Sequence, residues 1–361
     1  MAKQQGTMEG LGLTTFWQGK RVLLTGHTGF KGGWLALWLH RVGAHVTGLS
    51  LLPESTPNLY GAAKVSELCD SHIGDIRDHR IVDQVVKGCQ PEVIFHLAAQ
   101  PLVRRSYRLP QATFDVNVMG SVNLLEAVRQ CESVRVVEMI TTDKVYRNHE
   151  WHWPYREDDT LGGHDPYSAS KAAAEIAIAS YRDAFLNARS CAVASARAGN
   201  VIGGGDWSED RLIPDAIRCW GSGKTLEIRR PDAIRPWQHV LEPLAGYLHL
   251  AEALYHRPEL AGAYNFGPNH DGDATVRQVI ELAKSAYGKG DVKYGQDVTG
   301  PHEAGNLRLD ISKSSRVLGF RPKWDLCQAI RQTIGWYREF ATGRDPRELC
   351  DRQIAAYEPA A

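Results

Sequence analysis

The chain has 361 residues, a formal net charge of zero and seven cysteines with no Cys-x-x-Cys pair. A chain without excess positive charge lacks the basic surface that nucleic acid or an anionic membrane requires. Scattered cysteines indicate reduced thiols rather than disulfides or a zinc site, and no apolar run approaches the ~20 residues of a membrane span. With no signal-peptide core in residues 1–15, these features predict a soluble cytoplasmic protein without metal, nucleic-acid or membrane partners.

A glycine-rich turn, residues 26–32, follows an apolar run at 21–25 and precedes a segment with helical apolar spacing at 33–42. A strand, a glycine turn and a helix in this order are typical of the first dinucleotide-binding unit of a doubly wound sheet. Gly26 allows the tight turn, and Gly29 lets the backbone approach a pyrophosphate at the helix N-terminus. Gly32 lets the helix and the strand pack closely.

The residue that selects the cofactor ribose is expected after the next strand, residues 44–49. An acid ~20 residues past the glycines would bind a 2′-hydroxyl, but residues 50–52 offer no carboxylate. No lysine or arginine lies in residues 42–63 to hold a 2′-phosphate, which leaves His27 and Lys31 as alternatives. The pattern favours NAD over NADP and suggests weak binding of the adenosine part of the cofactor.

Strand-like and helix-like segments then alternate as far as residue 197. We predict strands at 71–75, 92–97, 134–140 and 191–197, and helices at 78–87, 111–131 and 166–185. This alternation predicts an α/β fold, a doubly wound parallel Rossmann sheet with ligands beyond the carboxyl ends of its strands. Asp75 follows one such end, where it either meets the adenine or caps a turn.

Tyr167 and Lys171 are four residues apart. Asp165 and Pro166 just before them are a favourable N-cap and first residue for a helix. The Tyr167 and Lys171 side chains therefore lie on one helical face. An ammonium close to a phenol lowers the phenol pKa from ~10 by stabilising phenolate, and the same lysine can hold a ribose hydroxyl. After the dinucleotide-binding opening, this pair predicts hydride-transfer chemistry.

Residues 141–146, Thr-Thr-Asp-Lys-Val-Tyr, directly follow the strand at 134–140. Loops after parallel strands commonly carry function. Asp143 and Lys144 add an acid and an amine that simple alcohol oxidation does not need, so we predict proton chemistry beside the oxidised carbon. The alternative is a solvated surface ion pair.

After residue 199 the alternation ends, and we predict a smaller, mainly helical substrate lobe. The expected segments are loops at 199–207 and 235–240, a strand at 264–267, and helices at 212–220, 241–253, 276–286, 318–324 and 329–340. The expected domains are a Rossmann domain at 17–199 with about 240–268, a lobe at 200–239 with about 269–345, and termini at 1–16 and 346–361. Arg211 and Arg235 are favoured over Arg229 and Arg230 as diphosphate ligands, since they lie beside loop signals.

From about Gly19 to Tyr337 the chain resembles the extended short-chain dehydrogenase/reductase family. The motifs that carry the resemblance are Gly26–Gly32 with Trp34, Leu97–Arg104, Thr141–Tyr146, Asn200–Trp207, Arg211–Pro214, Arg235–Pro243 and His302–Ala304. The pair Asp143-Lys144 is similar to that of the CDP-glucose 4,6-dehydratases. Dehydratases for dTDP-glucose carry Asp-Glu there, those for GDP-mannose a glutamate at the second position, and 4-epimerases lack the acid.

The resemblance implies NAD in the large lobe and CDP-glucose in the small one. The implied cofactor contacts are Gly26, Thr28, Gly29, Phe30, Lys31, Gly32, Asp75, Ile76, Leu97, Ala98, Ala99, Asn117, Tyr167 and Lys171. The implied substrate contacts are Gln100, Arg104, Asn200, Arg211, Leu212, Arg235 and Glu303. A homodimer or homotetramer is expected, with the helices at 111–131 and 166–185 pairing across a two-fold axis.

The implied reaction converts CDP-D-glucose to CDP-4-dehydro-6-deoxy-D-glucose for 3,6-dideoxyhexose synthesis of the O-antigen type. Tyr167, with Thr142 and Lys171 as its catalytic partners, takes the C4 hydroxyl proton while NAD holds the hydride. Lys144 removes the C5 hydrogen and Asp143 protonates the departing C6 hydroxyl, so both must be uncharged, as burial favours. The alternatives are another sugar-nucleotide dehydratase or 4-epimerase, and a non-catalytic dinucleotide-binding regulator.

Overall fold

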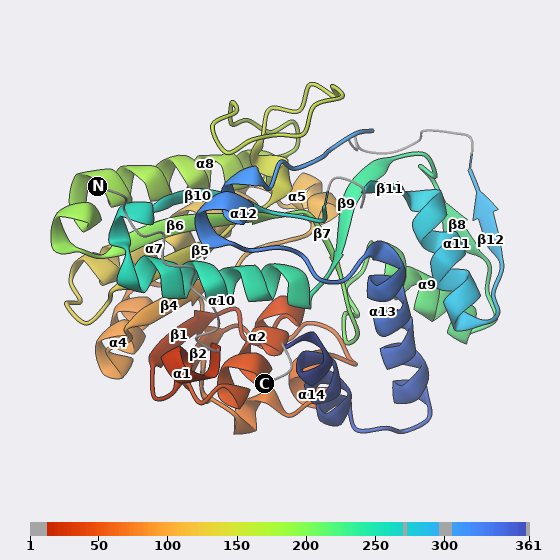
Figure 1. Ribbon diagram of the computed structural model, residues 1–361, viewed down its shortest axis with the longest axis horizontal. Helices are drawn as coiled ribbons and strands as arrows, with labels where there is room; N and C mark the ends of the chain where they lie inside the picture. Colours follow the sequence, from red (N-terminus) through yellow and green to blue (C-terminus); the bar gives the residue numbers. More distant parts are fainter. Residues whose placement is uncertain (1–12, 270–272, 296–304, 359–361) are drawn as a thin grey trace, which may run out of the picture.

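The computed structural model describes residues 13–269, 273–295 and 305–358, which form a large and a small lobe (Figure 1). The large lobe is built on a seven-stranded parallel sheet with the order β10-β6-β5-β4-β1-β2-β3. Its strands are β1 Arg21–Thr25, β2 His45–Ser50, β3 Asp70–Ile73, β4 Val93–His96, β5 Val136–Ile140, β6 Ala192–Ala198 and β10 Gly262–Phe266. The predicted doubly wound fold is confirmed, and the strand order changes direction between β1 and β4, where such sheets bind ligands.

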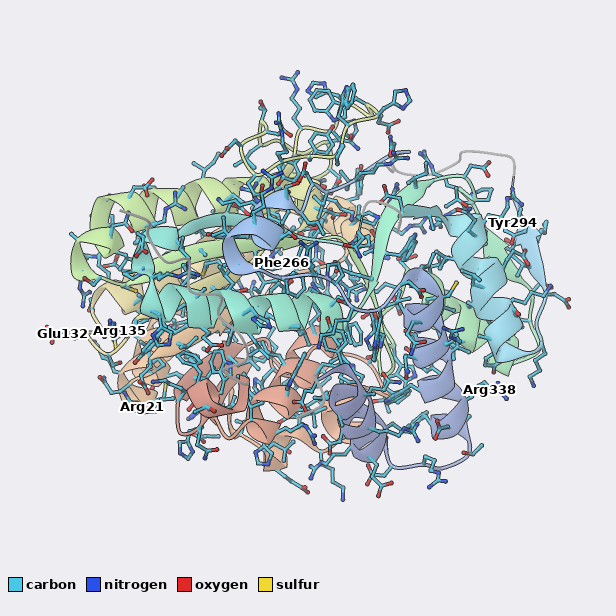
Figure 2. All side chains as sticks on the ribbon, in the orientation of Figure 1. Arg21, Glu132, Arg135, Phe266, Tyr294 and Arg338 are labelled. Atoms are coloured by element: carbon cyan, nitrogen blue, oxygen red, sulfur yellow. The ribbon has the colours of Figure 1, made fainter. Side chains whose placement is uncertain are left out.

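Helices cover both faces of this sheet because successive strand residues point to opposite sides. On β1, Val22 and Leu24 belong to one hydrophobic core and Leu23 belongs to the other. The first face is covered by α2 Phe30–Arg41 and α10 Leu241–His256, and the second by α4 His79–Cys89, α7 Gly120–Arg129 and α8 Pro166–Tyr181. Figure 2 shows Phe266 at the centre of the large lobe, and its ring contacts those of Tyr247 and Phe320.

The helix predicted at 111–131 is continuous, but it contains a π-helical turn at its centre. It consists of α6 Pro110–Phe114, the π turn η2 Asp115–Met119 and then α7. The other short elements of the large lobe are α1 Leu13–Trp17, α3 Leu59–Ala62, η1 Val65–Glu67, α5 Val103–Arg108, η3 Asp143–Val145, η4 Arg182–Leu186, η5 Asn187–Arg189, η6 Pro258–Leu260 and α12 Ser312–Leu318. Such π turns are often found at functional sites.

The small lobe combines helices with two short sheets. Its helices are α9 Leu212–Gly221, α11 Val276–Tyr287 and α13 Leu326–Ala341. The sheets are β11-β9-β7 and β12-β8, formed by β7 Asn200–Ile202, β8 Leu226–Ile228, β9 Ile234–His239, β11 Asp273–Thr275 and β12 Val292–Tyr294. Tyr294 and Arg338 lie on the outside of this lobe (Figure 2).

Three secondary-structure predictions were wrong. The loops predicted at 199–207 and 235–240 contain β7 and β9, which pair in parallel with Asn200 opposite Trp237. The helix predicted at 318–324 is absent, since α12 ends at Leu318 and Gly319 takes a left-handed conformation with φ 70°. The strands escaped prediction because each is short and is stabilised by a partner distant in the sequence.

The C-terminal segment predicted as a terminus forms the helix α14, Pro346–Tyr357. Asp345 caps it by accepting from the Arg347 amide at 2.7 Å. The Tyr357 hydroxyl donates to Glu242 Oε2 at 2.5 Å, which attaches α14 to α10. Within the described residues, no helix has the length and apolar character needed to cross a bilayer.

Candidate active site

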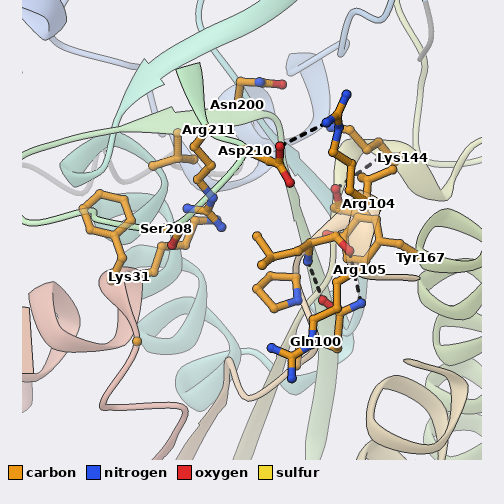
Figure 3. A pocket seen from close by; sticks show the side chains of 18 of the residues that line it. Lys31, Gln100, Arg104, Arg105, Lys144, Tyr167, Asn200, Ser208, Asp210 and Arg211 are labelled. Atoms are coloured by element: carbon orange, nitrogen blue, oxygen red, sulfur yellow. Dashed lines mark hydrogen bonds and ion pairs between the residues drawn. The ribbon is translucent and has the colours of Figure 1, made fainter. Parts of the chain in front are cut away.

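A cavity of about 1660 Å³ extends from the carboxyl ends of the central strands to the small lobe (Figure 3). Its walls include most of the side chains that the sequence predicted for cofactor, substrate and catalysis. Those lining it are Gly26, Thr28, Gly29, Phe30, Lys31, Gly32, Asp75, Ile76, Leu97, Ala98, Ala99, Gln100, Arg104, Thr142, Lys144, Tyr167, Lys171, Asn200, Arg211, Leu212 and Arg235. Asn117 and Asp143 lie behind the wall, and Glu303 is outside the described residues.

The glycine turn forms a close-packed cradle at the start of α2. Gly26 has a φ of 80°, and a Cβ there would lie 2.7 Å from the Ala98 nitrogen. A Cβ on Gly32 would lie 2.1 Å from the Gly26 oxygen, so helix and strand approach more closely than any side chain allows. The helix begins after Gly29 without a side-chain cap. Its first amides are thus available to an anion such as a pyrophosphate.

The end of β2, where a carboxylate could bind the ribose of the cofactor, carries hydroxyl groups instead. Thr28 Oγ1 lies 2.7 Å from Ser50 Oγ and donates to the Leu51 oxygen at 2.8 Å. A carboxylate does reach this part of the wall from Glu54, paired with Arg105 through NH2 and Oε1 at 2.9 Å. The prediction missed Glu54 because it lies four residues beyond the strand, where only the path of the loop brings it to the cavity.

Asp75 caps a turn, one of the two roles considered for it, and its contact with adenine stays a prediction. It lines the cavity, and its Oδ1 also accepts from the Arg77 amide at 2.9 Å as a turn cap. His27, an alternative phosphate ligand, is fully buried against Ser71 at 2.7 Å and does not line the cavity. Burial lowers the pKa of His27 to about 4, so it offers no positive charge at neutral pH.

The predicted catalytic pair lies on one face of α8, as the capping pattern indicated. Asp165 accepts from the Ser168 amide at 2.9 Å, and Lys171 Nζ donates to the Ile140 oxygen at 3.2 Å. The expected lowering of the phenol pKa by Lys171 is not found. Burial instead raises the pKa of Tyr167 to about 12, and it lowers that of Lys171 to about 8.

The strand end after β5 places three side chains in one hydrogen-bonded group. Thr142 Oγ1 donates to Asp143 Oδ1 at 3.0 Å, and Lys144 Nζ donates to the same oxygen at 2.9 Å. The Thr142 hydroxyl also offsets part of the effect of burial, which raises the pKa of Tyr167. Asp143 is 0% exposed and meets the cavity only through these neighbours, whereas Lys144 lines it directly. The predicted surface ion-pair alternative therefore does not apply.

Asn117, in the π turn, supports the wall without belonging to it. Its Oδ1 accepts from the Gln100 amide at 2.8 Å, and its Nδ2 donates to Ser170 Oγ at 2.9 Å. The Gln100 side chain is itself engaged, with Nε2 donating to Thr113 Oγ1 at 3.0 Å. These bonds connect the loop after β4 to α8 and hold its catalytic face in place.

Arginines from both lobes face the substrate end of the cavity. Arg211 pairs with Asp206 at 2.8 Å, and Arg104 pairs with Asp210 at 3.3 Å (Figure 3). Arg229, Arg230 and Arg235 also line this end, where Arg229 is exposed. Planar guanidinium groups in such number suit a diphosphate.

A family model described as GDP-mannose 4,6 dehydratase matches residues 23–333. A CDP-glucose 4,6-dehydratase of Salmonella typhimurium is 44% identical over 96% of this chain and 98% of its own length. The chain belongs to the GDP-mannose 4,6-dehydratase family, within the extended short-chain dehydrogenases/reductases. A more distant member, the dTDP-glucose 4,6-dehydratase of Streptomyces griseus, is 30% identical over 90% of this chain and 96% of its own.

Solved structures share the fold of this family member. A Thermus thermophilus UDP-glucose 4-epimerase in complex with NAD superimposes with a TM-score of 0.75 at 26% identity, covering 88% of this chain and 99% of that one. A Bacillus anthracis dTDP-glucose 4,6-dehydratase superimposes with a TM-score of 0.76 at 23% identity, covering 91% and 99%.

One buried group in this family member was not anticipated from its sequence. Glu175, four residues after Lys171 on α8, accepts from Thr141 Oγ1 at 2.5 Å and from Ser195 Oγ at 2.7 Å. Arg197 on β6 also binds it, through Nε at 2.9 Å and NH2 at 2.8 Å. The spacing of four after Lys171 was the available signal, since it places both side chains on one face of the helix.

Proposed function

We propose that this chain is a CDP-glucose 4,6-dehydratase, a hydro-lyase that uses bound NAD to form CDP-4-dehydro-6-deoxy-D-glucose for deoxysugar synthesis. The observation that carries the proposal is the position of Lys144, which lines the same cavity as Tyr167 and Thr142. An oxidation at C4 and a proton removal at C5 can therefore act on one bound sugar. The 44% identity to the Salmonella enzyme supports the choice of substrate.

The residues present fit a dinucleotide. The Gly26–Gly32 cradle and the uncapped start of α2 suit the pyrophosphate, and Ser50 and Asp75, which line the same cavity, would face the adenosine. Lys171 and Tyr167, which also line the cavity, would face the nicotinamide. NAD supplies a hydride acceptor during oxidation and a hydride donor during reduction, so the cycle needs no further reductant.

In this proposal Tyr167, as phenolate, removes the C4 hydroxyl proton while Thr142 hydrogen-bonds the same oxygen. Lys171, one helical turn away, stabilises the phenolate by its charge. The resulting ketone makes the C5 hydrogen acidic, and Lys144 removes it from its place on the cavity wall.

Departure of the C6 hydroxyl requires a proton, and Asp143 is the proposed source. Because Asp143 does not line the cavity, its proton leaves by way of Lys144 Nζ, 2.9 Å away. Direct donation by Asp143, as first expected, would require its side chain to turn toward the substrate. Arg211, Arg235 and Arg104 hold the diphosphate, which fixes the sugar between these groups.

The decisive experiment incubates the protein with NAD and a panel of CDP-, dTDP-, UDP- and GDP-glucose, followed by mass spectrometry of the products. We expect CDP-glucose alone to lose water and form a 4-keto-6-deoxy sugar. In deuterated water the product is expected to carry deuterium at C5. Turnover of another nucleotide sugar in place of CDP-glucose would reassign the substrate, and epimerisation without water loss would reject the dehydratase assignment.

The pH dependence of turnover follows from the Tyr167–Lys171 pair. With the pKa of Lys171 lowered to about 8 by burial and that of Tyr167 raised to about 12, the pair loses its first proton as the pH rises through about 8. The remaining proton is shared, and phenolate with ammonium is one form of that state. We expect kcat to rise through this range and then level off. A profile that is flat from pH 6 to pH 10 would contradict this assignment.

We further propose that the protein forms a homodimer through α6, η2, α8 and η4. Large apolar side chains are exposed on this surface: Phe114, Met119, Ile176 and Phe185. Ile176 is the most exposed of them, at 63%. Monomeric soluble proteins rarely expose a large contiguous apolar patch. Two copies related by a two-fold axis would bury this surface.

Replacement of Ile176 with glutamate is therefore expected to shift the protein toward monomer, since charges would meet across the axis. Sedimentation velocity over a range of concentrations measures the change. Ile73→Glu on the edge strand β3, where the side chain is 49% exposed, is the control and should leave the assembly intact. An unchanged sedimentation coefficient for the Ile176 variant would place the interface elsewhere.

A further inference from the structure

The proposed reaction, on which this inference rests, passes through a stage at which the sugar must not leave. Oxidation at C4 gives a 4-keto sugar, while Tyr167 holds the hydroxyl proton and the cofactor holds the hydride. The hydride returns to C6 only after water has been lost. If the 4-keto sugar departs before that, the hydride and the proton of Tyr167 stay behind, and the site cannot begin another turnover. The cavity therefore has to remain closed around this intermediate.

The short helix α5 lies at the wall of this cavity and is fixed to the large lobe. Gln100, just before it, accepts from the Leu102 amide at 2.7 Å and donates to the Leu102 oxygen at 3.1 Å. Ser106, on the helix itself, is fully buried. Arg104 and Arg105, also on this helix, both line the cavity. The helix thus presents two guanidinium groups to the cavity from a fixed base.

Asp210 lies in a segment that is fixed to the small lobe. The Trp207 ring contacts that of Trp336 on α13, with ring centroids 5.6 Å apart. Arg218 on α9 donates to the Trp207 oxygen at 2.9 Å and to the Ser208 oxygen at 3.0 Å. Two helices of the small lobe therefore hold this segment, and Asp210 lines the cavity from that side.

An ion pair joins the two lobes at the cavity. Arg104 NH1 lies 3.3 Å from Asp210 Oδ1, and Figure 3 shows the two side chains pointing toward each other. The neighbouring Arg105 donates through NH2 to Glu54 Oε1 at 2.9 Å. Glu54 belongs to the loop after β2 and lines the cavity as well. The same short helix is therefore attached to the small lobe by one arginine and to the loop after β2 by the next.

The pair between the lobes is partly exposed, with 30% of the Arg104 side chain and 37% of the Asp210 side chain accessible. Ion pairs of this kind are individually weak because water competes for both charges. Asp210 also has a left-handed backbone with φ 57°, which Asp and Asn adopt more readily than other residues apart from glycine. A weak contact on a fixed turn can break to admit a ligand and re-form afterwards.

We infer that Asp210 is a positioning residue whose ion pair with Arg104 closes the cavity between the lobes and retains the 4-keto intermediate until the hydride has returned. The pair breaks when the sugar nucleotide enters and re-forms over it. It breaks again when the product leaves. No covalent bond changes in these steps, so the proton balance of the reaction is unaffected. Asp210 acts through Arg104 and not by contacting the sugar.

Three roles of Asp210 differ in their effect on the rates at which a nucleotide enters and leaves the cavity. Loss of a closing contact raises both rate constants, because the same barrier is crossed in both directions. Loss of a direct ligand raises the dissociation rate constant alone. Loss of a negative charge that only repels a diphosphate raises the association rate constant and lowers the dissociation rate constant.

Stopped-flow fluorescence with CDP measures both rate constants on the NAD-bound protein, since CDP is the nucleotide part of the substrate and does not react. We expect Asp210→Asn to raise each of them about 5-fold, as loss of a partly exposed ion pair allows. Asparagine keeps the size of the side chain and tolerates the left-handed backbone. Glu339→Gln is the matched control, because the carboxylate that pairs with Arg352 is also 37% exposed but lies away from the cavity. This variant should leave both rate constants unchanged.

Turnover of CDP-glucose gives an independent measurement. Mass spectrometry separates the product, which has lost water, from released 4-keto sugar, which has lost only two hydrogens. We expect the ratio of released 4-keto sugar to product to rise about 5-fold or more in Asp210→Asn and to stay unchanged in Glu339→Gln. A melting temperature equal to that of the unaltered protein shows that the fold is intact.

Unchanged rate constants for CDP in Asp210→Asn would overturn the closing contact. So would a change in dissociation alone or changes of opposite sign, since these identify a direct ligand or a repelling charge. An unchanged ratio of released 4-keto sugar to product would show that the pair does not retain the intermediate. Failure of the unaltered protein to dehydrate CDP-glucose would instead reject the proposed function, whereas the CDP measurement does not depend on turnover, so the two failures are distinct.

Discussion

Replacement of Tyr167 with phenylalanine is expected to reduce the turnover of CDP-glucose by about 10²- to 10⁴-fold, the usual contribution of a general acid–base group. The change removes the phenol oxygen that takes the C4 hydroxyl proton and leaves the buried ring in place. The protein should therefore keep its fold and its affinity for NAD. Absorbance of the 4-keto product under base measures turnover, and tryptophan fluorescence titration measures NAD binding.

Tyr181→Phe is the matched control for this change. Tyr181 lies at the other end of the same helix, where its hydroxyl donates to Glu126 at 3.4 Å, away from the cavity. We expect this variant to turn over at the rate of the unaltered enzyme. If Tyr167→Phe kept more than a tenth of the activity, the phenol would not be the C4 base.

Replacement of Glu175 with glutamine is expected to lower the free energy of unfolding by about 3–5 kcal/mol, the usual cost of leaving one member of a buried ion pair without its partner. Glu175 and Arg197 are each only 4% exposed. Burial alone would raise the pKa of Glu175, but the hydrogen bonds and charge of Arg197, with Ser195 and Thr141, hold it below its ordinary value. The pair thus stabilises the fold at neutral pH, and this stabilisation is lost as the pH falls through the lowered pKa.

Replacement of Glu175 should also slow catalysis, because this side chain connects the segment that carries Thr142 to the helix that carries Lys171. It accepts from Thr141, which precedes Thr142, and it lies one turn beyond Lys171 on α8. Arg197 extends the connection by donating to the Tyr146 hydroxyl at 2.9 Å. Chemical denaturation measures the stability, and turnover measured well below the melting temperature separates the catalytic effect from unfolding.

Asp83→Asn is the control for the stability measurement. Asp83 forms an exposed pair with Lys87 on α4 at 2.7 Å, and such pairs contribute less than about 1 kcal/mol. A Glu175 variant no less stable than the Asp83 variant would show that the buried pair contributes little. The double variant Glu175→Leu with Arg197→Met should recover part of the loss, since it leaves no unpaired charge.

Local sequence signals predicted the segments whose structure depends on near neighbours. The apolar run 21–25, the glycine turn and the following helix were placed correctly because the strand, the turn and the helix cap each depend on adjacent residues. Asp165 and Pro166 likewise determined where α8 begins, and hence the shared face of Tyr167 and Lys171. The strands β7 and β9 were missed because each gains its hydrogen bonds from the other, across more than thirty residues of sequence.

The sequence by itself determined the parallel sheet, the dinucleotide cradle and the residue types available for oxidation and proton transfer. Their spacing along single helices and turns is a local property that follows from backbone geometry. Only the tertiary structure decided that Asp143 lies behind the cavity wall, that burial raises rather than lowers the pKa of Tyr167, and that Glu175 meets Arg197. Burial and electrostatic environment depend on packing between distant segments, and no local pattern of residues specifies them.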